Sequence, residues 1–477
     1  MTRLAPPVAI DAGTEPVETT PPPGAPALSG RVPTGRVPSR RPVALFALAA
    51  AAVLATAGCS AGVADPGGNE TGNETGSESG QEAGADAEAG GHGSVEGAQQ
   101  VGEPQVKIAS VDAAGAVGLH DLLTGESTEL DPVGKPQALA SGGRYLFVTT
   151  EAGLEVVDSG VWTWDHVDHF HYYRSDPRPV GAVAGEGEST VSTSSLPTAG
   201  STGVFFQGSH EAVLLDNEAL SEGAPEERFR IGLPAHRGLV APVGAGALVT
   251  VPDASGTVAE VQYYDAEGSP VEGVSAACPA AEGTITTRVG VVVGCLDGAV
   301  LATVDADGKP ALEHVPYPEG TEAPPATAFA NRKGRPTVAA LAGEGEAQRG
   351  VWLLDTRERV WELLPAPEPL VKVAAVDDAD THVVALGASG RLHVLTAGPG
   401  EEAPAVVGST EALAAAPDGG ALTADTPGLD LVVDQQRAYV NDPASGVVHE
   451  IAYNGEARLA RTLETPVGAD FFTEVGR

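Results

Sequence analysis

Three histidines that lie close together are the strongest candidates for chemistry in this sequence. His166, His169 and His171 fall in the segment VWTWDHVDHFHYYRSDPRPVG. Neutral imidazole is a common zinc ligand, and three imidazoles leave a fourth tetrahedral position for a carboxylate, a water molecule or an incoming ligand. The cluster therefore predicts a zinc site, although a histidine-containing surface loop that binds no metal is the alternative.

The spacing of the three histidines decides whether they can converge. His169 and His171 are two residues apart, so an extended strand projects them from one face. His166 requires a turn between Asp165 and Asp168, and aspartate is a common turn residue. These two aspartates are also candidates for additional metal ligands or for acceptors of imidazole N–H groups. Five aromatic residues are expected to wall the site: Trp162, Trp164, Phe170, Tyr172 and Tyr173.

Two other histidines are candidates to complete the metal site. His210 lies at an expected hairpin turn, and His236 precedes an expected innermost strand from which it could face a central channel. The remaining single histidines are expected to be packed or solvated: His120, His314, His382, His393 and His449. The sequence has no Gly-x-Ser-x-Gly elbow, P-loop, dinucleotide fingerprint or His-Glu-x-x-His motif. We therefore expect a protein that binds metal and is not an enzyme.

The elements that must position these residues are strands. Residues 105–477 contain short Val, Ala and Leu runs closed by turn signals such as Asp-Ala-Glu-Gly and Asp-Ala-Asp-Gly-Lys. The runs group into repeated units of about 40–50 residues, which is the length of a four-stranded blade. This pattern predicts an all-β fold, a β-propeller of seven or eight blades, with a pair of β-sandwich domains as the alternative.

The first 104 residues differ in composition from this region. Residues 1–58 contain a basic stretch, an apolar run and the sequence Thr-Ala-Gly before Cys59, which predict a lipoprotein signal peptide with lipid attached to Cys59. Residues 59–104 are rich in Gly, Glu and Ser and predict a flexible acidic linker. We expect an extracytoplasmic protein held by its lipid to the outer face of the cytoplasmic membrane.

The cysteines predict a disulfide, and the net charge excludes one class of partner. Cys278 and Cys295 lie 17 positions apart among apolar strands, and in an exported protein they predict a disulfide that joins neighbouring strands of one blade. The formal net charge is −38, with 27 basic and 65 acidic residues. Such a charge repels phosphate backbones, so nucleic acid is not an expected partner.

Several segments resemble the AztD-type zinc metallochaperones. They are the histidine-rich DHVDHFHYYR, the later RAYVNDPASGVVHEIAY and ETPVGADFFTEVGR, and the cysteine segments ACPAAEG and VVVGCLDG. The resemblance spans the predicted propeller. It implies a zinc-binding β-propeller outside the cytoplasm, with zinc on His166, His169 and His171. Members of the family often carry a His/Asp-rich segment near the mature N-terminus, whereas the linker here offers only His92.

The resemblance also implies a function and a partner. It implies that zinc passes directly to the solute-binding protein of a zinc ABC importer. Two alternatives remain from the residues alone. One is a metal-dependent propeller hydrolase, in which the histidines hold a catalytic metal and an activated water. The other is a metal-independent interaction scaffold. Hydrolysis that requires the metal would favour the first, and loss of stoichiometric zinc on mutating the histidines would exclude the second.

Overall fold

The structure, a computed structural model, describes residues 93–165, 169–343, 345–398 and 403–477. The predicted signal peptide, the lipid-attachment residue Cys59 and most of the predicted linker, including His92, lie outside these ranges. Two predicted site residues, His166 and Asp168, also lie outside them. The described part begins within the predicted linker.

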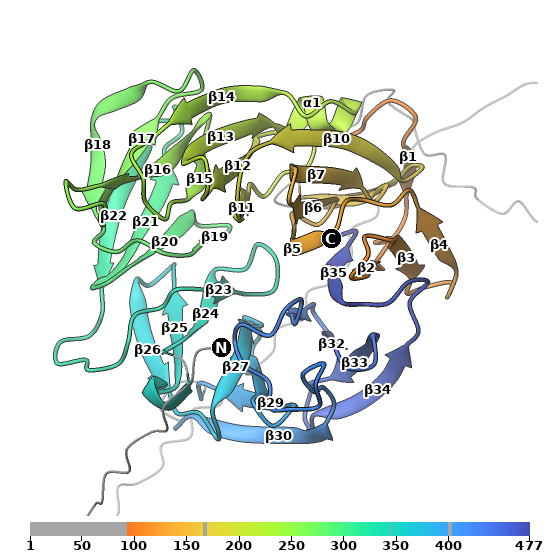
Figure 1. Cartoon of the computed structure of the whole chain (residues 1–477). Coiled ribbons are helices and arrows are strands. Elements are labelled where there is room, and N and C mark those ends of the chain that lie inside the picture. Colours follow the sequence, from red (N-terminus) through yellow and green to blue (C-terminus); the bar gives the residue numbers. More distant parts are fainter. Residues whose placement is uncertain (1–92, 166–168, 344, 399–402) are drawn as a thin grey trace, which may run out of the picture. The chain divides into compact units, whose positions relative to one another are not determined.

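Eight four-stranded antiparallel sheets are arranged around a central axis in the described part of the chain (Figure 1). The all-β class and the β-propeller prediction are therefore confirmed, with eight blades. Blades one to four, each from its innermost strand outward, are β35 (Phe471–Val475), β2 (Lys107–Val111), β3 (Val117–Asp121) and β4 (Ser127–Leu130); β5 (Pro136–Ser141), β6 (Tyr145–Thr150), β7 (Gly153–Asp158) and β10 (Arg178–Ala184); β11 (Ser189–Thr193), β12 (Ser201–Phe206), β13 (Glu211–Asp216) and β14 (Glu227–Gly232); β15 (Val240–Val243), β16 (Gly246–Pro252), β17 (Val258–Tyr264) and β18 (Pro270–Ala277).

The remaining four blades continue the ring in chain order. Blades five to eight are β19 (Thr284–Thr286), β20 (Val291–Cys295), β21 (Gly298–Val304) and β22 (Pro310–Pro316); β23 (Phe329–Ala330), β24 (Thr337–Leu341), β25 (Val351–Asp355) and β26 (Val360–Leu364); β27 (Leu370–Ala375), β28 (His382–Gly387), β29 (Arg391–Thr396) and β30 (Ala405–Ala412); β31 (Leu431–Val433), β32 (Arg437–Asp442), β33 (Val447–Ala452) and β34 (Arg458–Leu463). Within the described ranges, two short helices lie outside the sheets: α1 (Asn217–Glu222) and the 3-10 helix η1 (Gly345–Ala347).

The turn signals of the sequence form tight turns between strands. In the connection between β21 and β22, Asp305 Oδ1 accepts hydrogen bonds from the backbone N–H groups of Asp307 and Lys309. Gly308 has φ of 77°, a left-handed conformation that glycine adopts without steric cost. An aspartate that begins the turn and a glycine that ends it thus fix the short hairpins from which the blades are built.

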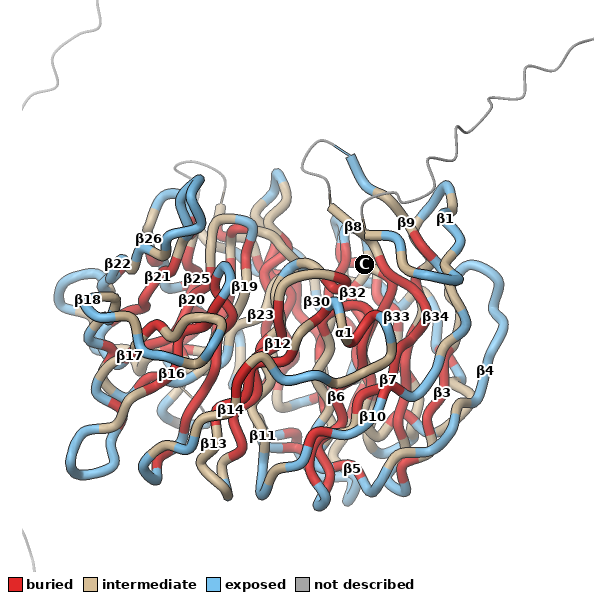
Figure 2. Tube along the Cα trace, turned by 90° about the horizontal axis from the view of Figure 1, so that it is seen from above, coloured by how far each residue is buried: buried red, intermediate tan, exposed pale blue. Residues whose placement is uncertain are grey.

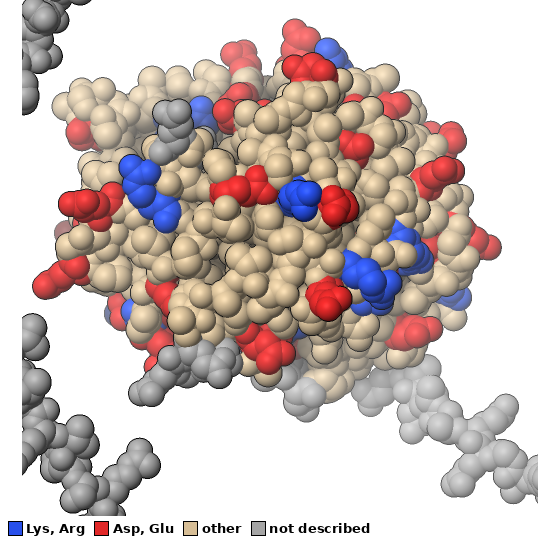
Figure 3. All heavy atoms as spheres, turned by 90° about the horizontal axis from the view of Figure 1, so that it is seen from below, with Lys and Arg blue, Asp and Glu red and all other residues tan. Residues whose placement is uncertain are grey.

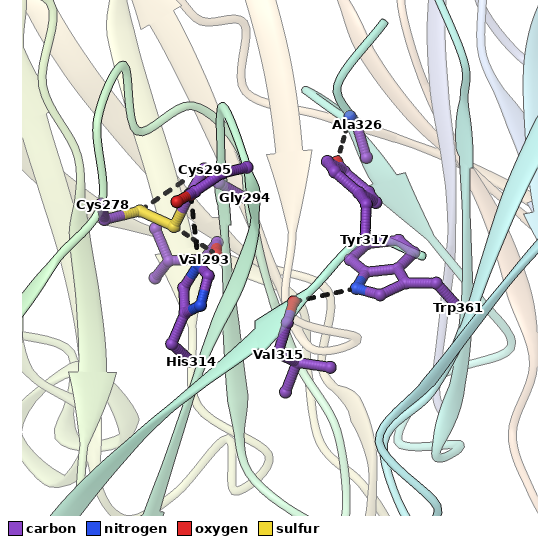
Figure 4. The surroundings of a disulfide bond; sticks show 10 residues. Cys278, Val293, Gly294, Cys295, His314, Val315, Tyr317, Ala326 and Trp361 are labelled. Atoms are coloured by element: carbon purple, nitrogen blue, oxygen red, sulfur yellow. Dashed lines mark hydrogen bonds and ion pairs between the residues drawn. A yellow bond between two sulfur atoms is a disulfide. The ribbon is translucent and has the colours of Figure 1, made fainter. Parts of the chain in front are cut away.

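The hydrophobic core is divided among the spaces between neighbouring blades. Figure 2 shows buried residues along the inner parts of the blades and exposed residues in the loops and outer strands. Between blades five and six, Trp352 and Trp361 pack at 5.7 Å between ring centroids, and both contact Tyr317. Trp361 Nε1 donates to Val315 O at 3.0 Å (Figure 4). Each blade is therefore stabilised mainly by the blades beside it.

The first blade combines distant parts of the chain. Its innermost strand, β35, pairs antiparallel with β2, so that Lys107 lies opposite Val475 and Val111 lies opposite Phe471. Segments separated by more than 350 residues thus share one sheet and close the ring.

The predicted disulfide between Cys278 and Cys295 is present, but it does not lie within one blade (Figure 4). Cys278 directly follows β18, the outer strand of blade four, whereas Cys295 ends β20 of blade five. The prediction of a bond within one blade was wrong, because the residues between the two cysteines contain the crossing from one blade to the next. The disulfide is a covalent link between two blades.

Reducing this disulfide should destabilise the protein without unfolding it under native conditions. A closed loop of this length is associated with about 3 kcal/mol of stabilisation. We expect the midpoint of urea unfolding to fall when reductant is added. A Cys278→Ala/Cys295→Ala variant should unfold at the lower midpoint and should not respond to reductant. An unchanged midpoint for the reduced parent would show that the blades hold together equally well without the bond.

Most of the charged side chains on the side of the propeller drawn in Figure 3 are acidic. Acidic side chains are spread over the side drawn in Figure 3, with basic side chains in a few small groups. Within the described ranges, none of the helices has the length and apolar character that crossing a membrane would require.

Candidate metal site on the hairpin β8–β9

The histidine cluster lies on a hairpin inserted into blade two. β8 (Val161–Asp165) and β9 (Phe170–Arg174) follow β7 and precede β10, the third and fourth strands of that blade. The hairpin joins β1 (Gln99–Val101) in a separate three-stranded sheet, in the order β1-β9-β8. Figure 2 shows this small sheet at one face of the propeller. β8 and β9 are antiparallel, with Asp165 opposite Phe170, and the predicted turn between Asp165 and Asp168 falls on residues outside the described ranges.

The strand register determines which side chains of the hairpin share a face. Trp162 lies opposite Tyr173 and Trp164 lies opposite His171. Trp162 and Tyr173 are each 1% exposed and stack at 5.3 Å between ring centroids. Burial raises the pKa of the Tyr173 hydroxyl above its ordinary value. These two rings form an apolar base beneath the hairpin, whereas Phe170, near the tip, is 50% exposed. Of the five aromatic residues expected to surround the site, Trp162 and Tyr173 therefore lie beneath the hairpin and support it.

A buried ion pair supports this base from below. Arg144, 1% exposed, donates from Nε and Nη2 to the two carboxylate oxygens of Asp158 at 2.9 and 2.7 Å. Its guanidinium carbon lies 3.8 Å from the centroid of the Trp162 ring and 5.1 Å from that of Tyr145. A desolvated cation over an aromatic face is a favourable electrostatic contact. The hairpin is thus attached to the folded blade through Trp162.

Two of the three predicted zinc ligands are in direct contact. Nε2 of His169 lies 3.0 Å from Nε2 of His171, and the rings meet edge to face with centroids 4.7 Å apart. Two nitrogens bound to one tetrahedral zinc at 2.0–2.1 Å would lie about 3.3 Å apart. The pair therefore needs a shift of only a few tenths of an ångström to share a metal ion. His169 is exposed and His171 is half-buried, so solvent reaches the pair.

Gln100 on β1 contacts the inner ring of this pair and was not identified from the sequence. Its Nε2 lies 3.0 Å from Nδ1 of His171. An amide nitrogen donates, so Nδ1 of His171 accepts in this contact. Gln100 was missed because its segment is polar and acidic; it becomes a strand only by pairing with β9.

Asp165, a predicted metal or supporting residue, makes an ion pair with a distant blade. Its Oδ2 accepts from Arg288 Nη2 at 2.6 Å. Arg288 lies in the connection between β19 and β20 of blade five, whereas the hairpin belongs to blade two. Thr163 Oγ1 also donates to Gly476 O at 2.7 Å. These contacts fix the direction of the hairpin relative to the other blades.

His210 and His236 are not brought to the hairpin. His210 lies in the turn between β12 and β13, as predicted, and His236 lies between β14 and β15. In a propeller, connections between second and third strands and connections between blades lie on the face opposite the third-to-fourth connection that carries the hairpin. His236 is buried, with Nδ1 2.7 Å from Pro234 O and Nε2 3.0 Å from Thr250 Oγ1. Both ring nitrogens of His236 thus lie within hydrogen-bonding distance of neighbouring protein atoms, and the side chain does not face a central channel.

The single histidines make local hydrogen bonds. Burial lowers the pKa of His120 and of His449, whose Nδ1 atoms lie 2.9 and 3.0 Å from Ser127 Oγ and Thr462 Oγ1. The others each lie beside a carboxylate: His314, His382 and His393. No group of three or more His, Cys, Asp or Glu side chains that could hold a metal occurs among the described residues. They contain the His169–His171 pair, while His166 and Asp168 belong to the connection outside them.

Comparison with known proteins supports the fold. No protein-family model matches the chain. The crystal structure of AztD from Citrobacter koseri is similar, with a TM-score of 0.64 and 19% sequence identity over 78% of this chain and 98% of that chain. The structure of apo AztD from the same organism has the same TM-score and identity, over 79% of this chain and 99% of that one. The chain therefore has the propeller fold of AztD over nearly the whole length of that protein.

Proposed function

We propose that this protein is an extracytoplasmic zinc metallochaperone that delivers zinc to the solute-binding protein of a zinc ABC importer. The observation that carries the proposal is the contact of 3.0 Å between Nε2 of His169 and Nε2 of His171 at an exposed hairpin. The fold likeness to AztD and the resemblance of the histidine segment to AztD-type zinc metallochaperones point in the same direction. Zinc is the cargo in this proposal.

The proposed binding step replaces a hydrogen bond by two metal bonds. Zinc would bind both Nε2 atoms in place of their hydrogen bond, and a proton on Nε2 of His171 would be transferred through solvent to Nδ1 of the same ring. His166 is proposed as the third ligand, with an exchangeable fourth position. Nδ1 of His171 must then carry the proton of the neutral ring, and Gln100, with its amide turned over, would accept it. Such an outer acceptor orients a histidine ligand and raises its basicity.

The proposed delivery step uses the position of the hairpin tip. His169 and Phe170 are both exposed, so an acceptor protein can approach the metal and pack on an apolar ring. An acceptor ligand that enters the fourth position before an imidazole leaves would transfer zinc without releasing it. The buried pair Trp162–Tyr173 and the ion pair of Asp165 with Arg288 would hold the base of the hairpin during this exchange.

The proposed compartment follows from the chain's covalent chemistry. A disulfide between two blades persists in oxidising surroundings outside the cytoplasm. The signal peptide predicted in residues 1–58 and lipid on Cys59 would keep the propeller near the importer, with the acidic linker as a tether. The solute-binding protein is then a partner in the same compartment.

A transfer experiment tests the proposed function directly. The zinc-loaded protein is mixed with a metal-free solute-binding protein of a zinc importer in the presence of a chelator of intermediate affinity. We expect zinc to reach the acceptor faster than the chelator can be loaded. Hydrolytic activity plays no part in the readout. Transfer that passes entirely through the chelator would contradict a metallochaperone and leave a zinc-binding protein of another kind.

Replacing Gln100 should weaken zinc binding while leaving the ligands in place. We expect Gln100→Ala to lower zinc affinity by about 10-fold, because the acceptor for Nδ1–H of His171 is lost. The affinity is measured by chelator competition. Gln99→Ala is the matched control, since Gln99 lies on the same strand but hydrogen-bonds Arg174 and should leave zinc affinity unchanged. Equal losses in both variants would mean that β1 matters only for the fold.

A further inference from the structure

A polar hollow lies on the propeller face that carries the hairpin, but over different blades. Its volume is about 550 Å³. Its lining comes from first-to-second and third-to-fourth strand connections of blades six, seven and eight. These connections reach the same face as the β7–β10 connection of blade two. None of its lining residues is a proposed zinc ligand.

Two of the three arginines in the hollow are neutralised within the protein. Asp377, whose side chain is 5% exposed, accepts from Arg335 Nε at 2.9 Å and from Arg357 Nη2 at 2.8 Å. Thr337 Oγ1 donates to the same carboxylate at 2.5 Å. Asp377 has φ of 54°, an uncommon conformation for a residue other than glycine. Backbone strain of this kind is concentrated at binding and active sites.

Arg332 differs from the other two arginines. Its guanidinium lines the hollow and makes no hydrogen bond or ion pair with any described residue. Burial and the nearby charge of Arg335 lower its pKa below the ordinary value for arginine. A half-buried cation that lacks a partner is costly to the folded protein unless it meets an anion. The hollow thus offers one guanidinium for an external ligand.

His382 adds an acceptor to the same lining. Its Nδ1 donates to Asp378 Oδ2 at 2.7 Å, while Asp378 Oδ1 accepts the backbone N–H of His382 at 3.0 Å. This carboxylate fixes the tautomer, so that Nε2 of the neutral ring carries a lone pair. No hydrogen bond joins Nε2 to the residues that the structure describes. Nε2 can therefore accept a hydrogen bond from a hydroxyl group. Gln435 and Asn454 contribute amide groups to the lining.

We propose that this hollow binds a small oxyanion that also carries a hydroxyl group, such as hydrogen phosphate or a 2-hydroxycarboxylate. Arg332 would bind the charged oxygens, and Nε2 of His382 would accept the hydroxyl proton. Guanidinium is well suited to carboxylate and phosphate because its N–H groups can bind two oxygens at once. The net negative charge of the chain disfavours adventitious anion binding. Arg332, whose guanidinium has no ion pair or hydrogen bond within the described residues, supplies the local attraction, although the carboxylates of Asp377 and Asp378 oppose it.

The choice of anions distinguishes this proposal from general attraction to positive charge. Metal-free protein is titrated at constant ionic strength with hydrogen phosphate, sulfate, malate and succinate. Sulfate and succinate have charge without a hydroxyl group. We expect phosphate or malate to bind about 10-fold more tightly than its partner without a hydroxyl, which is the effect of one hydrogen bond to a charged ligand. Phosphate is an inorganic anion and malate is a 2-hydroxycarboxylate. Whichever of the two binds more tightly identifies the chemical class of the ligand.

Two variants and one control test the named residues. Arg332→Met should lower the affinity by at least about 10-fold. It should unfold thermally at the same or a higher temperature than the parent without ligand, because no bond within the described chain is lost. His382→Gln should retain anion binding but abolish the preference for the hydroxyl group. Arg458→Met, a change to an exposed arginine on β34, should alter neither.

The outcomes that overturn the proposal are equally distinct. No binding of phosphate or malate to the folded parent would overturn it. Binding that persists in Arg332→Met would place the anion elsewhere. Equal affinity for phosphate and sulfate, and for malate and succinate, would show that His382 does not recognise the hydroxyl group. Because the protein is free of metal throughout, none of these results depends on zinc binding or on transfer to an acceptor.

Discussion

Replacing His169 and His171 together by alanine is expected to abolish tight zinc binding. Both Nε2 atoms that approach to 3.0 Å are removed, and the described residues contain no group of three or more candidate ligands that could take their place. We expect affinity to fall by more than about 100-fold, beyond the 10–100-fold typical for loss of a supporting residue. Elemental analysis gives the zinc content, and chelator competition gives the affinity.

The control for this double variant removes two histidines elsewhere. His120 and His314 make hydrogen bonds in blades one and five and are not expected to bind zinc. His120→Ala/His314→Ala should retain one tightly bound zinc. His166→Ala tests the third predicted ligand separately. If the His169→Ala/His171→Ala protein retained one tight zinc, the metal would lie at another site and the proposed function would lose its basis.

Replacing Arg144 by methionine is expected to destabilise the folded protein strongly. The side chain of Asp158, 1% exposed, would lose its bidentate partner and remain buried as a charge. Breaking such a buried pair costs about 3–5 kcal/mol. The cation beneath Trp162 would be lost as well, so the base of the hairpin should loosen. Urea unfolding measures the stability, and tryptophan fluorescence reports on the hairpin.

A second substitution separates the charge from the packing. Arg144→Met/Asp158→Leu should regain much of the stability, since replacing a buried ion pair by apolar groups is often neutral or favourable. Arg391→Met is the matched control, because its pair with Glu411 is solvent-exposed and worth about 1 kcal/mol or less. A loss for Arg144→Met no greater than that for Arg391→Met would mean that the buried pair does not stabilise the blade.

Local patterns in the sequence were sufficient to predict the fold. Apolar runs closed by Asp and Gly predicted hairpins, and Asp305 and Gly308 show why, since a side-chain acceptor and a left-handed residue define the turn. The same reasoning predicted that His169 and His171 share a face. These features depend on a few adjacent residues. They are therefore visible in a single sequence.

Features that depend on the arrangement of blades could not be predicted in this way. Gln100 supports His171 only because β1 pairs with β9, which lies some 70 residues later. The ion pair of Asp165 with Arg288 spans two blades. The prediction placed the disulfide within one blade for the same reason. The boundary between blades four and five falls between its two cysteines. Each of these contacts joins residues from different structural units of the propeller, which a local sequence pattern does not specify.

The pairing of β35 with β2 also affects how such a protein can mature. A chain that is made, and as we propose exported, from its N-terminal end presents β2 long before residues 471–475 emerge. Until then, β2 has an unpaired edge of the kind that promotes aggregation. If the chain is exported as we propose, its folding would be completed only after translocation, and a newly exported molecule would need protection from its neighbours during that delay. The proposed zinc site, on a hairpin whose Thr163 donates a hydrogen bond to Gly476 O, would then be complete only in molecules whose translocation has finished.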